Sequence, residues 1–241
     1  LQMPNCDELA QVILDEKVKI VTTGAGSPKK YIPAFKEAGV KVIPVIASVR
    51  HAIKMQAAGV DAVVAEGQEA GGHIGQTSTM SLLPQIVDAV DIPVLGAGGV
   101  GDGRSLAAIY ALGAQGVQVG TLFLSAEECP IPDSYKERLI NAIDTDTIVT
   151  GRKAKDPVRS LKNPMLLKFA ELEEANAPHE ELEKLTLGSL SRAVYDGDME
   201  TGSAMAGEIA GMIKNIRPVK QIIEELFNEA EKKAASLKIS Y

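Results

Sequence analysis

Short runs rich in β-branched residues recur along the first half of the chain, and each is followed by a stretch with helical hydrophobic spacing. This alternation predicts βαβ units and a parallel sheet. The runs are almost continuously apolar, which is typical of strands buried on both faces. We predict five strands, at 19–23, 41–46, 62–66, 93–97 and 116–120, with helices at 28–38, 48–58, 79–90 and 103–112.

Glycines stand where three of these helices end, at Gly39, Gly59 and Gly113, as left-handed C-caps do. The five units are compatible with two α/β fold classes. One is an open doubly wound sheet, and the other is a (β/α)8 barrel whose first three strands lie upstream of Leu1.

After residue 125 the alternation stops. We expect a helix at 134–143, an extended segment at 147–151 and mostly helical structure from 160 to 214. The segment 218–237 has the spacing of an amphipathic helix. Its predicted apolar face consists of Val219, Ile222, Ile223, Leu226 and Ala230.

The composition excludes several classes of function. The chain has 241 residues, a net charge of −7 and no Trp, which argues against nucleic-acid binding. Its two cysteines, Cys6 and Cys129, form no disulfide framework or metal motif, which fits a cytoplasmic protein. No apolar run approaches the ~18 residues of a membrane span. We therefore expect no nucleic acid, membrane or metal partner.

Two successive predicted strands end in glycine-rich turns, Gly96-Ala97-Gly98-Gly99 and Gly120-Thr121. Such turns bring backbone N–H groups close to an anion, and a helix that begins near Gly103 would add its positive dipole end. Paired turns of this kind are typical of the phosphate site of β/α barrels. The alternative is that the glycines only form tight turns. Gly24-Ala25-Gly26 lacks the third glycine of a dinucleotide fingerprint.

The loop at 65–75 (AEGQEAGGHIG) leaves a predicted strand and carries four glycines, two carboxylates and His73. A histidine can transfer protons near neutral pH. We interpret His73 as catalytic because it follows a strand end among glycines, and the competing interpretation is a structural histidine. His51 and His179 are predicted to be non-catalytic, since neither lies in such a loop.

That loop, the segment PVLGAGGVGDGRSLAAIYALGAQGVQVGT and the segment GSAMAGEIAG together resemble one family. It is the family of flavin-dependent enoyl-acyl-carrier-protein reductase II and the nitronate monooxygenases (2-nitropropane dioxygenases). The resemblance covers essentially the whole chain. It implies an FMN-binding TIM (β/α)8 barrel, its N-terminal strands absent from this chain, with a small, mainly helical inserted domain. The missing strands, a glycine loop and an Asn would precede Leu1, and residues 1–3 would directly follow the third strand.

The resemblance also implies site residues. His73 matches the active-site histidine beside the flavin ring. The implied flavin contacts are Glu66 and Gly71, the implied phosphate-binding residues are Gly98, Gly99, Gln118, Val119, Gly120 and Thr121, and the implied substrate-side residues are Ser203 and Met205.

Two positions favour the reductase. Many nitronate monooxygenases carry Gln at the position of Glu66 and Arg at the position of Ile74. The resemblance then implies NADH or NADPH as co-substrate, an acyl carrier protein thioester as substrate in fatty-acid synthesis, a homodimer and a possible monovalent cation. The alternatives are oxidation of small nitronates with O2, and a non-redox phosphate-binding barrel or inactive fragment.

The segment 151–162 contains five basic residues and one acidic residue. It is either a solvated loop or a docking site. The docking site would bind phosphates, the acidic carrier protein or NAD(P)H, and Arg159 is the residue that we assign to it. We expect three parts in the chain. These are five βα units at 1–125, a helical substrate-side domain at 126–214, and an amphipathic helix at 215–241 that packs on the barrel.

Overall fold

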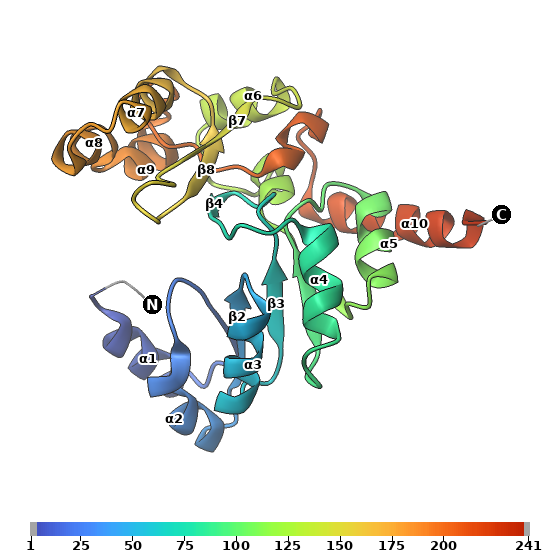
Figure 1. Cartoon of the computed structure of the whole chain (residues 1–241). Helices are drawn as coiled ribbons and strands as arrows, with labels where there is room; N and C mark the ends of the chain where they lie inside the picture. The colour runs from blue at the N-terminus through green and yellow to red at the C-terminus, as the bar shows by residue number, and fades with distance from the viewer. Residues whose placement is uncertain (1–3, 239–241) are drawn as a thin grey trace. The chain divides into compact units, whose positions relative to one another are not determined.

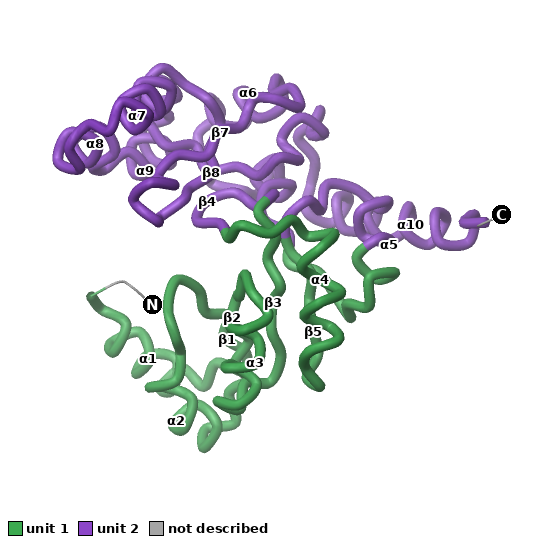
Figure 2. Tube along the Cα trace, in the orientation of Figure 1, with its two compact units in different colours: residues 1–68, 75–97, 109–118 green, residues 69–74, 98–108, 119–241 purple. Residues whose placement is uncertain are grey.

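The computed structural model describes residues 4–238 and divides the chain into two compact units, which are coloured separately in Figure 2. Unit 1 holds the chain up to Gln68, together with 75–97 and 109–118. Unit 2 holds 69–74, 98–108 and the chain from Val119 onward. The expectation for residues 1–3 lies outside the described part.

Unit 1 is built on a parallel sheet with the strand order β1-β2-β3-β5-β6. All five predicted strands are confirmed, with ends that differ by one or two residues. They are β1 Ile20–Thr23, β2 Lys41–Ile46, β3 Val63–Glu66, β5 Val94–Ala97 and β6 Gly116–Gln118. Each strand pairs with its neighbour in sequence, whereas a doubly wound sheet reverses its strand order at a switch point. The order is therefore that of a β/α barrel.

The helices between these strands are also confirmed. They are η1 Pro28–Lys30 with α2 Ile32–Glu37, then α3 Val49–Ala58, α4 Thr79–Val87 and α5 Gly103–Ala111 (Figure 1). Gly39, Gly59 and Gly113 all have positive φ angles, as the C-cap interpretation requires. One helix, α1 Cys6–Asp15, was not predicted. The core includes Val42 and Val63 of the sheet and Leu83 and Ile86 of α4.

Unit 2 contains a second, antiparallel sheet with the order β4-β8-β7. Its strands are β4 Gly72–His73, β8 Val158–Leu161 and β7 Thr147–Thr150. Only β7 corresponds to a predicted extended segment. The predicted loop at 65–75 thus contains a short strand, and the predicted basic loop at 151–162 contains β8.

The remainder of unit 2 is mainly helical, as predicted. Its elements are η2 Thr121–Ser125, α6 Asp133–Ile140, α7 Pro164–Glu174, α8 His179–Thr186, α9 Ser189–Ser191, η3 Arg192–Asp196, η4 Glu208–Met212 and α10 Val219–Ser236. Ile222, Leu226 and Ala230 form the buried face of α10. The prediction was wrong for Ile223, which is 41% exposed. Within residues 4–238 no helix is both long and apolar enough to cross a bilayer.

Candidate active site

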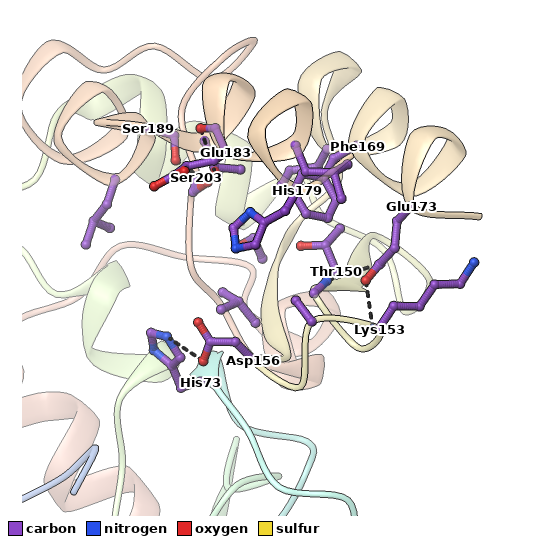
Figure 3. A pocket seen from close by; sticks show the side chains of 18 of the residues that line it. His73, Thr150, Lys153, Asp156, Phe169, Glu173, His179, Glu183, Ser189 and Ser203 are labelled. Atoms are coloured by element: carbon purple, nitrogen blue, oxygen red, sulfur yellow. Dashed lines mark hydrogen bonds and ion pairs between the residues drawn. The ribbon is translucent and has the colours of Figure 1, made fainter. Parts of the chain in front are cut away.

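The predicted catalytic histidine is held in the small sheet of unit 2. His73 pairs with Val158 of β8, and the Ile74 N–H donates to the Pro157 carbonyl at 3.0 Å. The imidazole is about half exposed, and its Nε2 lies 3.4 Å from Oδ1 of Asp156 (Figure 3). Backbone pairing therefore fixes the position of His73, while its side chain stays accessible to a ligand.

The glycines before His73 have a packing role that the sequence did not reveal. A Cβ on Gly71 would lie 2.7 Å from the carbonyl carbon of Ala206, and a Cβ on Gly207 would lie 2.5 Å from the Glu69 carbonyl oxygen. The Glu208 N–H also donates to that oxygen at 2.9 Å. The backbone that approaches this loop is thus the protein's own segment 206–208. Gly71 is explained by packing, whether or not it also contacts a flavin.

The first predicted phosphate loop follows β5. Gly98 and Gly99 have φ angles of +84° and +78°, a conformation that L side chains rarely adopt. The backbone after β5 therefore requires glycine at both positions, and the Glu69 side chain lies beside Gly99.

The second predicted loop runs from Val119 to Thr121, where η2 begins. A Cβ on Gly120 would meet no atom within 4 Å, so open space lies beside this backbone. The Thr121 hydroxyl accepts the Gly207 N–H at 2.8 Å, which fixes the loop within unit 2. The backbone at Gly120 is thus open to a ligand, which the predicted phosphate loop requires.

We predicted that the N-terminus of α5 would help to bind a phosphate, but the structure does not support this role. The Gly103 N–H donates to Oε2 of Glu229 at 2.9 Å, and Oδ1 of Asp102 accepts the N–H groups of Arg104 and Ser105. Protein carboxylates therefore occupy the positive end of this helix, so it gives no support to the predicted role in phosphate binding.

Two of the predicted cofactor-binding residues, a flavin contact and a phosphate-loop residue, lie in unit 1. Glu66 is the last residue of β3 and Gln118 the last residue of β6. Both are in register with Ala97 of β5, so they form one row at the carboxyl ends of three adjacent strands. This is the sheet edge at which ligands bind in parallel α/β folds. Burial raises the pKa of Glu66 to about 7, so this carboxyl can hold a proton near neutral pH.

A cavity of about 660 Å³ lies within unit 2. His73, Ser203 and Met205 all line it, so the structure brings together the predicted catalytic and substrate-side residues. Its walls are mixed: Leu166 and Phe169 of α7 contribute apolar surface, and charged side chains such as Lys153 and Glu173 line it as well. His179, predicted to be non-catalytic, also lines this cavity, and nothing in its sequence neighbourhood signals that position (Figure 3).

Arg159 does not lie on the surface of a basic loop. Its side chain is 8% exposed, its Nη2 lies 2.8 Å from Oε1 of Glu208, and its Nη1 donates to the Thr147 hydroxyl at 3.1 Å. Because successive side chains of a strand point to opposite faces, Arg159 points away from its neighbours Val158 and Ser160, which line the cavity. Arg159 is thus an internal ion-pair partner, and its placement gives no support to a docking role. No cluster of metal-ligating side chains occurs in the described part of the chain.

Several known proteins are similar to this chain. A probable nitronate monooxygenase of Staphylococcus saprophyticus is 34% identical over 217 residues, which cover 85% of this chain and 61% of that protein. FabK from Thermotoga maritima is 47% identical with a TM-score of 0.94, over 98% of this chain and 75% of that structure. A nitroalkane oxidase from Streptomyces ansochromogenes is 30% identical with a TM-score of 0.80, over 97% of this chain and 70% of that structure.

These similarities confirm the predicted barrel fold and the family resemblance. The chain spans about three fifths of the length of the curated relatives it matches. The family model described as nitronate monooxygenase matches residues 5–229, and the chain belongs to the nitronate monooxygenase family.

Proposed function

We propose that this chain carries the active site of an FMN-dependent oxidoreductase that reduces 2-enoyl thioesters with NADH or NADPH. The observation that carries the proposal is the similarity to FabK, an enoyl-acyl-carrier-protein reductase II, at 47% identity over 98% of the chain. Glu66, the residue common in the reductases, supports the same choice.

The residues present fit FMN. The backbone N–H groups of Gly98, Gly99 and Thr121, which all lie in unit 2, would hold its phosphate. When bound, FMN supplies the hydride chemistry between the nicotinamide and the β-carbon of the substrate.

His73 is the residue placed to act on the thioester. Its imidazole would donate a hydrogen bond to the thioester carbonyl or deliver the proton to the α-carbon. Ser203 and Met205 would contact the acyl group, since they line the same cavity as His73. This assigns the substrate side to the cavity of unit 2, which His73 and residues between 150 and 205 line. The substrate is a thioester of acyl carrier protein.

The second candidate is oxidation of alkyl nitronates with O2, in which His73 would act as a base. The family model and the staphylococcal relative favour it. One pair of assays separates the two. The reductase must oxidise NADH in the presence of crotonyl thioester, and the monooxygenase must consume O2 with propionate 3-nitronate in the absence of NADH. A colourless protein without absorbance near 450 nm after reconstitution with FMN would contradict both.

A further inference from the structure

A carboxylate of unit 2 lies beside the His73 side chain. Nε2 of His73 is 3.4 Å from Oδ1 of Asp156, and both residues line the cavity (Figure 3). This distance is slightly longer than that of a usual N–H···O hydrogen bond, and the hydrogen bonds of catalytic groups are often this long until a ligand binds. Both side chains are more than half exposed, so burial does not force them together. The contact therefore depends on how firmly the backbone holds Asp156.

Asp156 belongs to the turn 151–157, which connects β7 to β8 and which is fixed next to β4. The two residues after Asp156 contact the β4 segment directly, since the Pro157 carbonyl accepts the Ile74 N–H at 3.0 Å and Val158 pairs with His73. The end of the turn that carries Asp156 is thus attached to the backbone that carries His73.

The beginning of the same turn is held by α7. Oε2 of Glu173 accepts the Gly151 N–H at 3.2 Å, and Oε1 accepts the Lys153 N–H at 2.9 Å. The Gly151 carbonyl in turn accepts the Asp156 N–H at 3.0 Å. Gly151 therefore links the Glu173 carboxylate to the backbone of Asp156, and the turn is attached at both ends.

The partner of Asp156 is informative because its own turn is basic. Arg152, Lys153 and Lys155 belong to the turn 151–157, and all three are exposed. The ion pair in which the structure places Asp156 is nevertheless with His73. Neutralisation of neighbouring cations therefore does not explain this carboxylate, whereas contact with the imidazole does.

We propose that Asp156 is a positioning residue for His73, that Glu173 holds the turn which carries Asp156, and that Nδ1 of His73 is the nitrogen that acts on the ligand. A carboxylate only accepts hydrogen bonds, so Nε2 must carry the hydrogen that faces it. Nδ1 is then a proton acceptor in the neutral imidazole and a proton donor in the imidazolium. The chemistry assigned to Nδ1 rests on the proposed function, but the tautomer of His73 does not.

The tautomer can be measured without flavin and without turnover. In protein with ¹⁵N-labelled histidine, the chemical shifts of the two ring nitrogens show which one carries the hydrogen in the neutral imidazole. The chain has three histidines, His51, His73 and His179, so a spectrum of His73→Ala identifies the signals of His73. Wild-type His73 should be almost entirely in the Nε2–H form.

Two variants should change this tautomer, and a third should not. Asp156→Ala removes the acceptor, and Glu173→Ala releases the turn, so both should shift His73 toward the mixture of tautomers that an unconstrained imidazole shows. The matched control is Glu171→Ala. Glu171 is a carboxylate on the same helix, but it lies 3.3 Å from Lys168. Its replacement should leave the His73 signals unchanged.

Turnover of crotonyl thioester tests whether the tautomer matters for the reaction. Asp156→Ala should lower kcat about tenfold with KM nearly unchanged, which is the lower end of the effect of a hydrogen bond to a charged group, as suits exposed side chains. In a His73→Ala background the same replacement should have no further effect, because Asp156 acts through the imidazole.

Three results would overturn the proposal. The first is a tautomer ratio of His73 that is the same in the wild-type protein and in Asp156→Ala. The second is an unchanged kcat in Asp156→Ala, and the third is a loss of kcat that persists in the His73→Ala background. An unchanged tautomer in Glu173→Ala would overturn the part assigned to Glu173. Failure of the proposed function looks different: the tautomer responds to Asp156→Ala as expected, but no enoyl thioester is reduced by NADH.

Discussion

His73 combines a fixed backbone with an accessible side chain. Replacement by Ala should lower turnover of crotonyl thioester by ~10²–10⁴ if the imidazole is the general acid. FMN absorbance should persist, because β4 pairs with β8 through backbone groups that Ala retains. Steady-state kinetics on protein with verified flavin content measures this. Near-normal kcat with bound flavin would remove His73 from the chemistry.

Glu66 should make the free energy of unfolding depend on pH. Its pKa is raised to about 7 by burial, so between pH 4.5 and 7 the folded state binds more protons than the unfolded state. The contribution of Glu66 to the free energy of unfolding therefore falls as pH rises through this window. Glu66→Gln removes the effect. In FMN-free protein, its stability gain over wild type should be near zero below pH 4.5 and reach about 2–3 kcal/mol at pH 8. Urea unfolding at four pH values would measure this, and a gain independent of pH would contradict it.

The Arg159–Glu208 ion pair should contribute to the stability of the fold because the Arg159 side chain is buried, whereas that of Glu208 is exposed. Glu208→Ala removes the carboxylate that lies 2.8 Å from the guanidinium of Arg159, which is 8% exposed, and should destabilise the fold by about 2 kcal/mol. Glu171→Ala breaks the exposed Lys168–Glu171 pair and serves as the control, with an expected change below about 0.5 kcal/mol. Thermal unfolding of both variants would test this. Equal losses would show that burial of Arg159 has no energetic consequence.

At the scale of elements, the parallel sheet could be predicted because its signal is local. Runs such as KVIPVI at Lys41–Ile46 predict buried strands, and glycines such as Gly59 indicate where helices end. The sheet β4-β8-β7 could not be predicted, since β4 has two residues and exists only through pairing with β8, which is distant in sequence. The helix α1 was missed because it lies before the first strand, outside the alternation on which the prediction relied.

The residues of the candidate site also differ in whether a local sequence signal points to them. Gly98, Gly99 and Thr121 could be proposed from the sequence because they lie shortly after the ends of two predicted strands. Asp156 and His179 could not, because nothing in their sequence neighbourhood records that the folded chain turns them toward one cavity with His73. The role of Arg159 was misjudged since a basic run predicts charge but not the side to which each strand residue points.

For the molecule as a whole, FMN should act as a stabilising ligand through the phosphate loops. At a concentration of 100 Kd, binding adds about 2.7 kcal/mol, which for a chain of this size raises Tm by roughly 5–10 °C. Riboflavin, which lacks the phosphate, should give a much smaller rise. Gly99→Ala should weaken the FMN effect, because Ala at a φ of +78° strains the loop that would hold the phosphate.

The control for that variant is Gly39→Ala. Gly39 has a similar φ of +73°, and a Cβ there would meet no atom within 4 Å, so the backbone penalty is comparable while the phosphate loops stay intact. Both variants should lose about 1 kcal/mol without ligand. Only Gly99→Ala should then lose most of the FMN-dependent rise in Tm, as differential scanning fluorimetry with FMN and riboflavin would show. If the two variants respond to FMN alike, or if riboflavin stabilises the wild-type protein as much as FMN does, the loops after β5 and β6 do not bind the phosphate.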